Sequence, residues 1–354
     1  MPTQAAVLDA LKPVQDPELQ KSLVDLNMIR NVSVHQGQVK FTLVLTTPAC
    51  PLREFIVEEC KAAVQTLPEV TSVEVEVTAE TPQQKSLPDR TSIPGVKNII
   101  AVSSGKGGVG KSTVSVNIAV ALAQSGAAVG MIDADIYGPN VPTMLDLEDA
   151  VIEVQKHPTG DILQPAENYG IKLVSMGFLI DRDQPVIWRG PMLNGIIRQF
   201  LYQVNWGNLD YLIIDLPPGT GDAQLTLAQA VPMAGVVIVS TPQNVAILDA
   251  RKGLKMFQQL GVSVLGVVEN MSYFIPPDLP ERQYDIFGSG GGAALTQELG
   301  LPLLGRVPLE MSVRQGGDAG QPILLSQPDS ASAQALRDIA QAVAGKVSVA
   351  ALTA

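Results

Sequence analysis

The sequence predicts an α/β protein whose mainly parallel sheet is covered by helices on both faces, preceded by a small α+β domain. Aliphatic runs of strand length recur between residues 96 and 308, and segments of helix length separate most of them. Continuous apolar strands that alternate with helices are typical of parallel sheets buried on both faces. The composition agrees, since 46% of the residues are apolar and only 4% are aromatic, so an aliphatic core is expected.

The small domain is expected at residues 1–80, with the element order αββαβ. A helix within residues 6–26, interrupted near Pro13 and Pro17, precedes two strands that meet around Gln36 and Gly37. The segment REFIVEECKAAVQTL (53–67) has apolar residues at helical spacing. The segment TSVEVEVT (71–78) alternates between apolar and polar residues, as a half-buried strand does.

Two segments are predicted to lie outside the domains. Residues 81–95 are polar and rich in proline without hydrophobic periodicity, which is the composition of a linker. Residues 346–354 form a tail without a clear pattern.

The second domain is expected at residues 96–345, where the texture of the sequence changes. Six aliphatic runs there predict strands: NIIAVSS (98–104), AAVGMID (127–133), YLIIDLP (211–217), AGVVIVST (234–241), VSVLGVVEN (262–270) and LPLLGRVP (301–308).

Charge and hydropathy exclude several classes of partner. The formal net charge is −11, whereas a nucleic-acid binder normally presents a basic face, so no nucleic acid is expected. The start of the chain lacks the charge and apolar run of a signal peptide, and no apolar stretch reaches the length of a membrane span. We therefore expect a soluble, cytoplasmic protein without a membrane partner.

A phosphate-binding loop follows the first strand of the second domain. Residues 105–112, GKGGVGKS, fit the pattern G-x-x-x-x-G-K-[ST] between a predicted strand and a predicted helix. In such a loop, backbone N–H groups and the helix N-terminus surround the phosphate oxygens. Lys111 is expected at the β and γ phosphates of ATP, Ser112 at Mg²⁺ and Thr113 at the α phosphate. The predicted ATP contacts in this loop are Gly105, Lys106, Gly107, Gly108, Val109, Gly110, Lys111, Ser112 and Thr113.

Acidic residues follow two of the predicted strands, where a P-loop nucleotidase needs them. Asp215 ends the strand at 211–217 and is expected to hold Mg²⁺ through a water, and Gly219 after it can donate its N–H to the γ phosphate. Asp133 is expected to contact Mg²⁺ through a water as well, and Asp135 to position the attacking water. The predicted catalytic residues are thus Lys106, Lys111 and Asp135.

With the additional Lys106, the loop resembles that of the deviant-Walker-A ATPases, which include division-site, partition, arsenite-pump and nitrogenase-reductase ATPases. The resemblance implies a face-to-face homodimer in which Lys106 reaches the phosphates bound by the partner. There it would neutralise charge as the β–γ bond breaks, as an arginine finger does.

Further motifs narrow the resemblance to the Mrp/ApbC group of iron–sulfur cluster carrier ATPases. In the second domain, over about residues 95–345, they are DIYGPNVP (135–142), WRGPM (188–192), DLPPGTGD (215–222) and ENMSYF (269–274). In the first domain, DPELQKSLVDLNMI (16–29) and LTTPACPL (45–52) resemble a small domain fused to iron–sulfur assembly proteins, or working with them. The resemblance implies an adenine contact by Asn270, a second near Pro308, a [4Fe–4S] cluster, and apo client proteins and an assembly scaffold as partners.

The sequence departs from this group at the cluster site. Many carriers have a C-x-x-C after the N-M-S segment, whereas this chain has Pro276 and Pro277 near that place. Its two cysteines are Cys50 and Cys60. Cys50 is the candidate cluster ligand, because it lies in a turn just before a predicted helix, where thiolate character is favoured. Cys60 is expected to be a buried apolar residue on a helix face.

Three functions remain open at this point. The first is an ATPase that carries iron–sulfur clusters, with its homodimer gated by nucleotide. The second is an ATPase adaptor in metallocentre assembly that has no cluster of its own, which the absent C-x-x-C favours. The third is a positioning switch like the division-site and partition ATPases.

Overall fold

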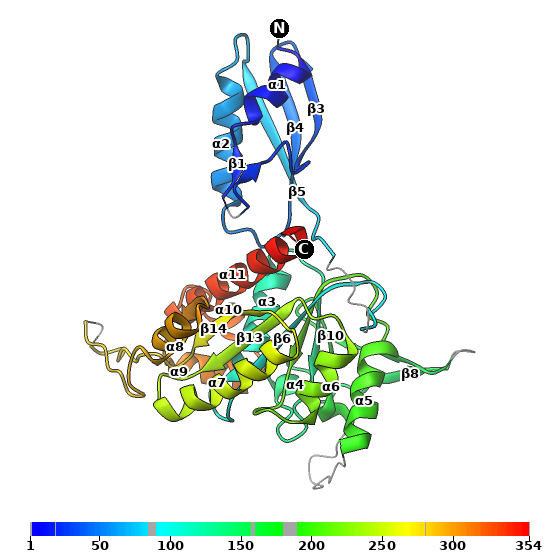
Figure 1. Cartoon of the computed structure of the whole chain (residues 1–354), viewed down its shortest axis with the longest axis vertical. Coiled ribbons are helices and arrows are strands. Elements are labelled where there is room, and N and C mark those ends of the chain that lie inside the picture. Colours follow the sequence, from blue (N-terminus) through cyan, green and yellow to red (C-terminus); the bar gives the residue numbers. More distant parts are fainter. Residues whose placement is uncertain are drawn as a thin grey trace. The chain divides into compact units, whose positions relative to one another are not determined.

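The computed structural model describes residues 2–17, 19–83, 90–156, 160–179, 190–279 and 281–353. The chain divides into two compact units, and Figure 1 labels their elements. The first unit contains Met1–Pro82 and Ala344–Ala354, and the second contains Gln83–Val343.

The first unit contains the αββαβ order that the sequence predicts, with one addition. Its elements are α1 (Gln4–Leu11), β1 (Gln15–Asp16), β2 (Lys21–Ser22), β3 (Ile29–His35), β4 (Gln38–Leu45), α2 (Arg53–Gln65) and β5 (Ser72–Ala79). The helix expected within residues 6–26 was predicted too long, because α1 ends at Leu11 and the short antiparallel pair β1–β2 follows. Lys12 still has helical backbone angles, but Pro13 has no N–H to continue the helical hydrogen bonds, which accounts for the early end.

A three-stranded sheet with the order β3-β4-β5 forms the centre of this unit. β3 is antiparallel to β4, and β4 is parallel to β5. Gln36 and Gly37 both have positive φ, of 48° and 83°, as the tight turn of a hairpin requires. Alternate residues of β4, such as Phe41 and Leu43, pack on one face of the sheet in a common core with α1 and α2.

An eight-stranded sheet lies in the second unit, with the order β10-β11-β7-β12-β6-β13-β14-β15. Neighbouring strands are parallel throughout, except that β10 at the edge is antiparallel to β11. The six predicted strands are all present, as β6 (Val96–Ser104), β7 (Val129–Asp133), β12 (Leu209–Asp215), β13 (Gly235–Ser240), β14 (Val264–Glu269) and β15 (Leu303–Arg306).

The sequence reading missed four shorter strands, β8 (Glu153–Gln155), β9 (Ile162–Gln164), β10 (Ala166–Asn168) and β11 (Ile171–Ser175). β8 and β9 form a separate antiparallel pair. β11 is buried at the sheet, but Lys172 interrupts its apolar run, and Lys172 donates to the carbonyl of Trp206. Short strands with internal polar residues carry little signal in a single sequence.

Helices cover both faces of this sheet (Figure 1). Ile99 and Ala101 of β6 face a core shared with α5 (Gly190–Tyr202), α6 (Asp222–Ala230), α7 (Asn244–Gln259) and α8 (Gly291–Leu299). Alternate residues of β6 point to the opposite face, where α3 (Lys111–Gln124) packs against β6, β7 and β12. The remaining helices are α4 (Val141–Met144), the 3₁₀ helix η1 (Met176–Leu179), α9 (Met311–Asp318), α10 (Ile323–Ser326) and α11 (Ala331–Thr353).

Two predicted boundaries differ from the structure. The linker was expected to extend to residue 95, but Ile93 is buried in the core of the second unit and the Thr91 N–H donates to the carbonyl of Ala230. Residues 84–89 of the predicted linker lie outside the described residues. The tail expected at 346–354 is helical through Thr353, because α11 continues across it with Val347 buried. Among the described residues, no helix has both the length and the apolar character needed to cross a bilayer.

Candidate active site

The carboxyl ends of three adjacent strands bring the predicted phosphate-site residues together. β6 ends at Ser104, β7 at Asp133 and β12 at Asp215, and Asp133 and Asp215 are paired in the parallel register. β6 lies in the middle of the sheet, between β12 and β13. The strand order reverses there, since β7 lies beyond β12 on one side of β6, whereas β13 and β14 lie on the other side. Ligands of open parallel sheets bind at such a place.

The phosphate loop turns tightly between β6 and α3. Gly108 and Gly110 have φ values of 79° and 80°, a left-handed conformation that glycine adopts without strain. Glycine is also required by close packing, because a Cβ on Gly105 would lie 2.2 Å from the backbone of Asp249 on α7. A Cβ on Gly110 would lie 2.1 Å from Nδ2 of Asn270. The glycine pattern is therefore explained by backbone geometry as well as by phosphate binding.

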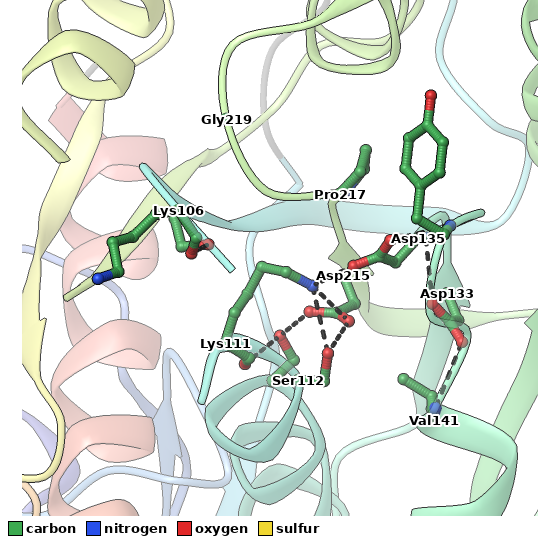
Figure 2. A network of polar contacts seen from close by, with 12 residues as sticks. Lys106, Lys111, Ser112, Asp133, Asp135, Val141, Asp215, Pro217 and Gly219 are labelled. Carbon is green, nitrogen blue, oxygen red and sulfur yellow. Dashed lines mark hydrogen bonds and ion pairs between the residues drawn. The ribbon is translucent and has the colours of Figure 1, made fainter. Parts of the chain in front are cut away.

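Asp215 is the centre of a buried polar cluster (Figure 2). Its Oδ2 lies 2.8 Å from the ammonium of Lys111 and accepts a 2.6 Å hydrogen bond from the hydroxyl of Ser112. Its Oδ1 accepts a 2.6 Å hydrogen bond from Ser115. The side chains of Lys111 and Asp215 are 6% and 0% exposed. Three predicted functional residues thus meet at one point, and Ser115 is a fourth member that the sequence reading missed.

Asp133 and Asp135 lie next to this cluster. Asp133 accepts hydrogen bonds from the hydroxyl of Ser175 (2.9 Å) and from the backbone N–H groups of Asp135 (3.2 Å) and Val141 (3.3 Å). Its contacts therefore hold the segment 135–141 against β7 and β11. Asp135 lies 3.5 Å from the ammonium of Lys111.

Burial shifts the protonation of both residues. Burial, together with the charge of Asp215, raises the pKa of Asp133 to about 8. Burial also raises the pKa of Asp135, while the nearby ammonium of Lys111 acts in the opposite direction. The raised pKa of Asp135 makes it a better proton acceptor.

The donor set fits a magnesium ion. Mg²⁺ prefers oxygen ligands and keeps several waters, so one hydroxyl and one carboxylate suffice on the protein side. Ser112 and Asp215 place such oxygens 2.6 Å apart beside the phosphate loop. In the part of the chain that the structure describes, no group of three or more His, Cys, Asp or Glu side chains is placed to hold a metal ion.

Two cavities meet beside the loop and together have the size of a nucleotide site. The smaller, about 190 Å³, is lined by the phosphate loop with Asp135 and Pro218. The larger, about 430 Å³, is lined by Asn270 and Pro308, the two predicted adenine contacts. Three residues, Thr113, Asn140 and Met144, line both cavities, so the two cavities adjoin. Asn140 and Met144 had not been predicted, although the DIYGPNVP motif contains the former.

Asn270 is tied directly to the loop, because its Nδ2 donates a 2.8 Å hydrogen bond to the carbonyl of Val109. Two other predicted contacts do not converge on the cluster. The N–H of Gly219 donates to the carbonyl of Ser104 at 2.8 Å. The side chain of Lys106 points away from Lys111 and Asp215 (Figure 2), and it makes no hydrogen bond or ion pair with any residue in the described ranges.

The two cysteines lie in the first unit and differ in environment. Cys60 on α2 is fully buried in the core, and burial raises the pKa of its thiol to about 12. Cys50 is half-buried in the turn before α2. The prediction that Cys60 is a core residue is confirmed, so Cys60 is unsuited to join Cys50 in holding a metal.

Thiol labelling should separate the two cysteines. In the native protein at pH 8, we expect Cys50 to react with a maleimide or disulfide reagent, and Cys60 to react only on unfolding. The raised pKa alone leaves roughly a thousandfold less thiolate on Cys60 than an ordinary cysteine has. One fast equivalent that disappears in Cys50→Ser, and a second equivalent released by denaturant, is the expected pattern. Fast labelling of native Cys50→Ser would contradict the burial of Cys60.

Two protein families match the chain, and one of them is a family of P-loop NTPases, as the geometry of the site indicates. Residues 95–344 match the family described as NUBPL iron-transfer P-loop NTPase, and residues 4–77 match the family described as iron-sulfur cluster assembly protein. Of the motifs that indicated this group, those at 135–142, 215–222 and 269–274 border the nucleotide cavities. Trp188 and Arg189 of the WRGPM motif lie outside the described residues.

Individual relatives extend the match over nearly the whole chain. A protein from Synechocystis sp. named iron-sulfur cluster carrier protein is 74% identical over 352 residues, which are 99% of this chain and 100% of that protein. The iron-sulfur cluster transfer protein NUBPL of Dictyostelium discoideum is 48% identical over 72% of this chain and 78% of that protein.

A solved structure also matches the chain. It is a nucleotide-binding protein from Archaeoglobus fulgidus in complex with ADP, 38% identical with a TM-score of 0.58, and it covers 67% of this chain and 91% of that chain. The phosphate loop, the buried Lys111–Asp215 pair and these matches together show that the chain belongs to the family of NUBPL-type iron-transfer P-loop NTPases.

Proposed function

We propose that this protein is an ATPase that carries iron–sulfur clusters to apo client proteins and works as a homodimer. The observation that carries the ATPase part is the convergence of Lys111, Ser112 and Asp215 beside the phosphate loop. The carrier part is supported by the match of both domains to iron–sulfur families and by relatives named as carriers.

Each residue of the site has a role in hydrolysis under this proposal. The loop amides and Lys111 bind the β and γ phosphates, and Ser112 and Asp215 hold Mg²⁺, which adds positive charge at the phosphates. Asp135, which is buried and has a raised pKa, orients the attacking water. Asp133 keeps the segment after β7 in place through the hydrogen bonds that it accepts from the N–H groups of Asp135 and Val141.

Adenine is the proposed base because of Asn270. An amide side chain offers both a donor and an acceptor to a base edge. Asn270 lines the 430 Å³ cavity, which also has the apolar side chains Met144, Leu309 and Val313 to contact a flat ring. Asn270 also contacts the carbonyl of Val109, so base and phosphate recognition are linked.

The homodimer is proposed because Lys106 lines the phosphate cavity but its side chain has no partner there among the described residues. Its side chain points away from the Lys111–Asp215 cluster, and a cation in a phosphate loop is of use only near a phosphate (Figure 2). A partner protomer facing the loop would receive Lys106 at its γ phosphate. Nucleotide binding would then close the two protomers, and hydrolysis would release them.

The cluster is cargo in this proposal, and Cys50 is its candidate ligand. Because Cys60 is buried, a homodimer supplies two accessible thiolates, whereas a [4Fe–4S] cluster has four ligand positions. The other positions would be filled by thiols of the client protein, of the assembly scaffold or of a small molecule. Such incomplete ligation by the carrier would favour transfer of the cluster.

Anaerobic reconstitution tests the carrier proposal. The wild-type protein is incubated with iron, sulfide and a small thiol, and the absorbance near the visible cluster bands is compared with that of Cys50→Ser. We expect the wild type to retain a cluster and Cys50→Ser to lose most of it, while both hydrolyse ATP equally.

A different outcome would favour the second candidate function. A colourless wild-type protein with normal ATP turnover would indicate an adaptor in metallocentre assembly without a cluster of its own. The absence of cysteine from residues 271–292 and the burial of Cys60 are the observations on which this alternative depends.

A further inference from the structure

One buried side chain, Gln224 on α6, binds the backbone of the loop that follows Asp215. Gln224 is 1% exposed. Its Nε2 donates two hydrogen bonds, to the carbonyl of Pro217 at 2.7 Å and to the carbonyl of Gly219 at 3.0 Å. Gln224 lies outside the residues that line the nucleotide cavities, so it acts on the loop and not on a ligand.

The same loop is also hydrogen-bonded to Ser104, the residue just before the phosphate loop. The N–H of Gly219 donates to the carbonyl of Ser104 at 2.8 Å. Figure 2 shows Pro217 and Gly219 on the segment that leaves Asp215. Pro218, between them, lines the 190 Å³ phosphate cavity together with Lys106 and Gly107. The loop is thus part of the wall of the phosphate site, and three hydrogen bonds fix its conformation.

Gly219 has the freedom that a second conformation needs. Its φ is 93°, and a Cβ placed on it would meet no atom within 4 Å. Glycine is therefore required there by backbone conformation and not by crowding. The peptide that carries the N–H of Gly219 joins Pro218 to Gly219, and it lies between the two peptides whose carbonyls Gln224 holds, so its rotation requires the chain on both sides to shift.

Gln224 is attached to the loop through its donor atoms alone. Its Oε1 is buried and has no hydrogen-bond partner within the described residues. A buried polar atom without a hydrogen-bond partner is uncommon in native proteins. Conversely, a replacement that removes the whole amide loses only the two donated bonds, because Oε1 makes none there.

We infer that Gln224 is a positioning residue that keeps the loop at 216–221 in a closed conformation. In this conformation, the N–H of Gly219 is bonded to the carbonyl of Ser104. The γ phosphate of a bound nucleoside triphosphate has to open this closed conformation. This inference rests on the proposed ATPase function. A γ phosphate is a charged acceptor and competes well with a carbonyl for the N–H of Gly219. A nucleoside diphosphate has no such group, so it leaves the closed conformation intact. Gln224 thereby sets how strongly the loop distinguishes the two nucleotides.

The ratio of two affinities tests this inference. Mg²⁺ with a non-hydrolysable ATP analogue, and Mg²⁺ with ADP, are titrated calorimetrically into the full-length protein. In Gln224→Met, we expect the affinity for the analogue to rise about tenfold, because two hydrogen bonds of the closed loop are lost, with ADP affinity unchanged. Gln224→Ala should change the ratio in the same direction. A merely structural role would weaken both nucleotides alike.

Gln229→Leu is the matched control, because Gln229 is exposed on the same helix. It should leave both affinities unchanged. An unchanged or lower ratio in a folded Gln224 variant would overturn the inference while leaving the ATPase proposal intact. If the wild-type protein bound neither nucleotide, the proposed function would be wrong and the inference would fall with it.

Amide exchange on the wild-type protein gives a second test that needs no variant. Without nucleotide, the N–H of Gly219 should exchange with solvent slowly, because it is bonded to Ser104. Exchange at the rate of an unstructured peptide would show that the closed loop does not exist, and would overturn the inference as well.

Discussion

Replacing Lys106 with alanine is expected to reduce ATP turnover by roughly a thousandfold, while the affinity for ATP stays within about threefold of wild type. The side chain of Lys106 points away from Lys111 and Asp215, so its loss leaves the Lys111–Asp215 cluster of its own chain intact. A cation supplied by a partner stabilises the charge that develops during phosphoryl transfer, and it contributes little to the ground state. Single-turnover hydrolysis and nucleotide titration measure the two quantities separately.

Mixing two inactive variants decides whether Lys106 acts across the dimer. Lys106→Ala keeps Asp135, and Asp135→Asn keeps Lys106. In a mixed dimer, the Lys106→Ala protomer has a complete site once its partner donates Lys106. An equimolar mixture should therefore regain roughly a quarter of wild-type turnover, since half of the dimers are mixed and each has one complete site. If the mixture stays inactive although both variants dimerise, Lys106 acts within its own chain or not at all.

Six strands of the parallel sheet were predictable because each lies within a mainly aliphatic run of the sequence. β6 and β12 are buried on both faces, and such strands have a strong signal in a single sequence. The phosphate loop was predictable for a different reason, since backbone geometry restricts its glycines as strictly as phosphate binding does. The positions of Asp133 and Asp215 beside the phosphate loop were predictable because both residues end strands of the parallel sheet.

The contacts made by polar residues inside helices could not be predicted in this way. Ser115 reaches Asp215, and Gln224 reaches Pro217, yet in the sequence both look like ordinary polar residues of amphipathic helices. Their function depends on which helix face meets which strand end, and that is decided by tertiary packing. Ser115 is three residues after Ser112, so helical spacing was the signal that could have found it.

The direction in which the Lys106 side chain points could not be predicted from the sequence either. The resemblance implied that it serves a partner, whereas the glycine loop by itself allowed either direction. In the structure, the side chain of Lys106 points away from the cluster of its own chain (Figure 2), and its role across a dimer stays a prediction. The dimer itself remains a prediction.

Asp215→Asn is expected to abolish hydrolysis and to destabilise the protein in the absence of nucleotide by about 3 kcal/mol. The ammonium of Lys111 is 6% exposed and is held by Asp215 at 2.8 Å and by Asp135 at 3.5 Å. Asparagine at position 215 would leave that buried charge with the more distant carboxylate alone. Its amide would also place a donor where Ser112 and Ser115 now donate. Denaturant unfolding without nucleotide measures the loss of stability.

The matched control for Asp215 lies on the same strand. Asp210 pairs with Lys97 at 2.8 Å, and the Lys97 side chain is 39% exposed. Asp210 also accepts a 2.9 Å hydrogen bond from the N–H of Ala128, which an asparagine oxygen can still accept, so Asp210→Asn should cost about 1 kcal/mol, less than Asp215→Asn. Nucleotide should also distinguish the variants, because phosphates bound at the loop offer Lys111 a replacement for the lost carboxylate. ATP should therefore stabilise Asp215→Asn more than it stabilises Asp210→Asn. Equal stability of the two variants without nucleotide would show that the Lys111–Asp215 pair is not the buried charge pair described here, and that the strand end tolerates its loss.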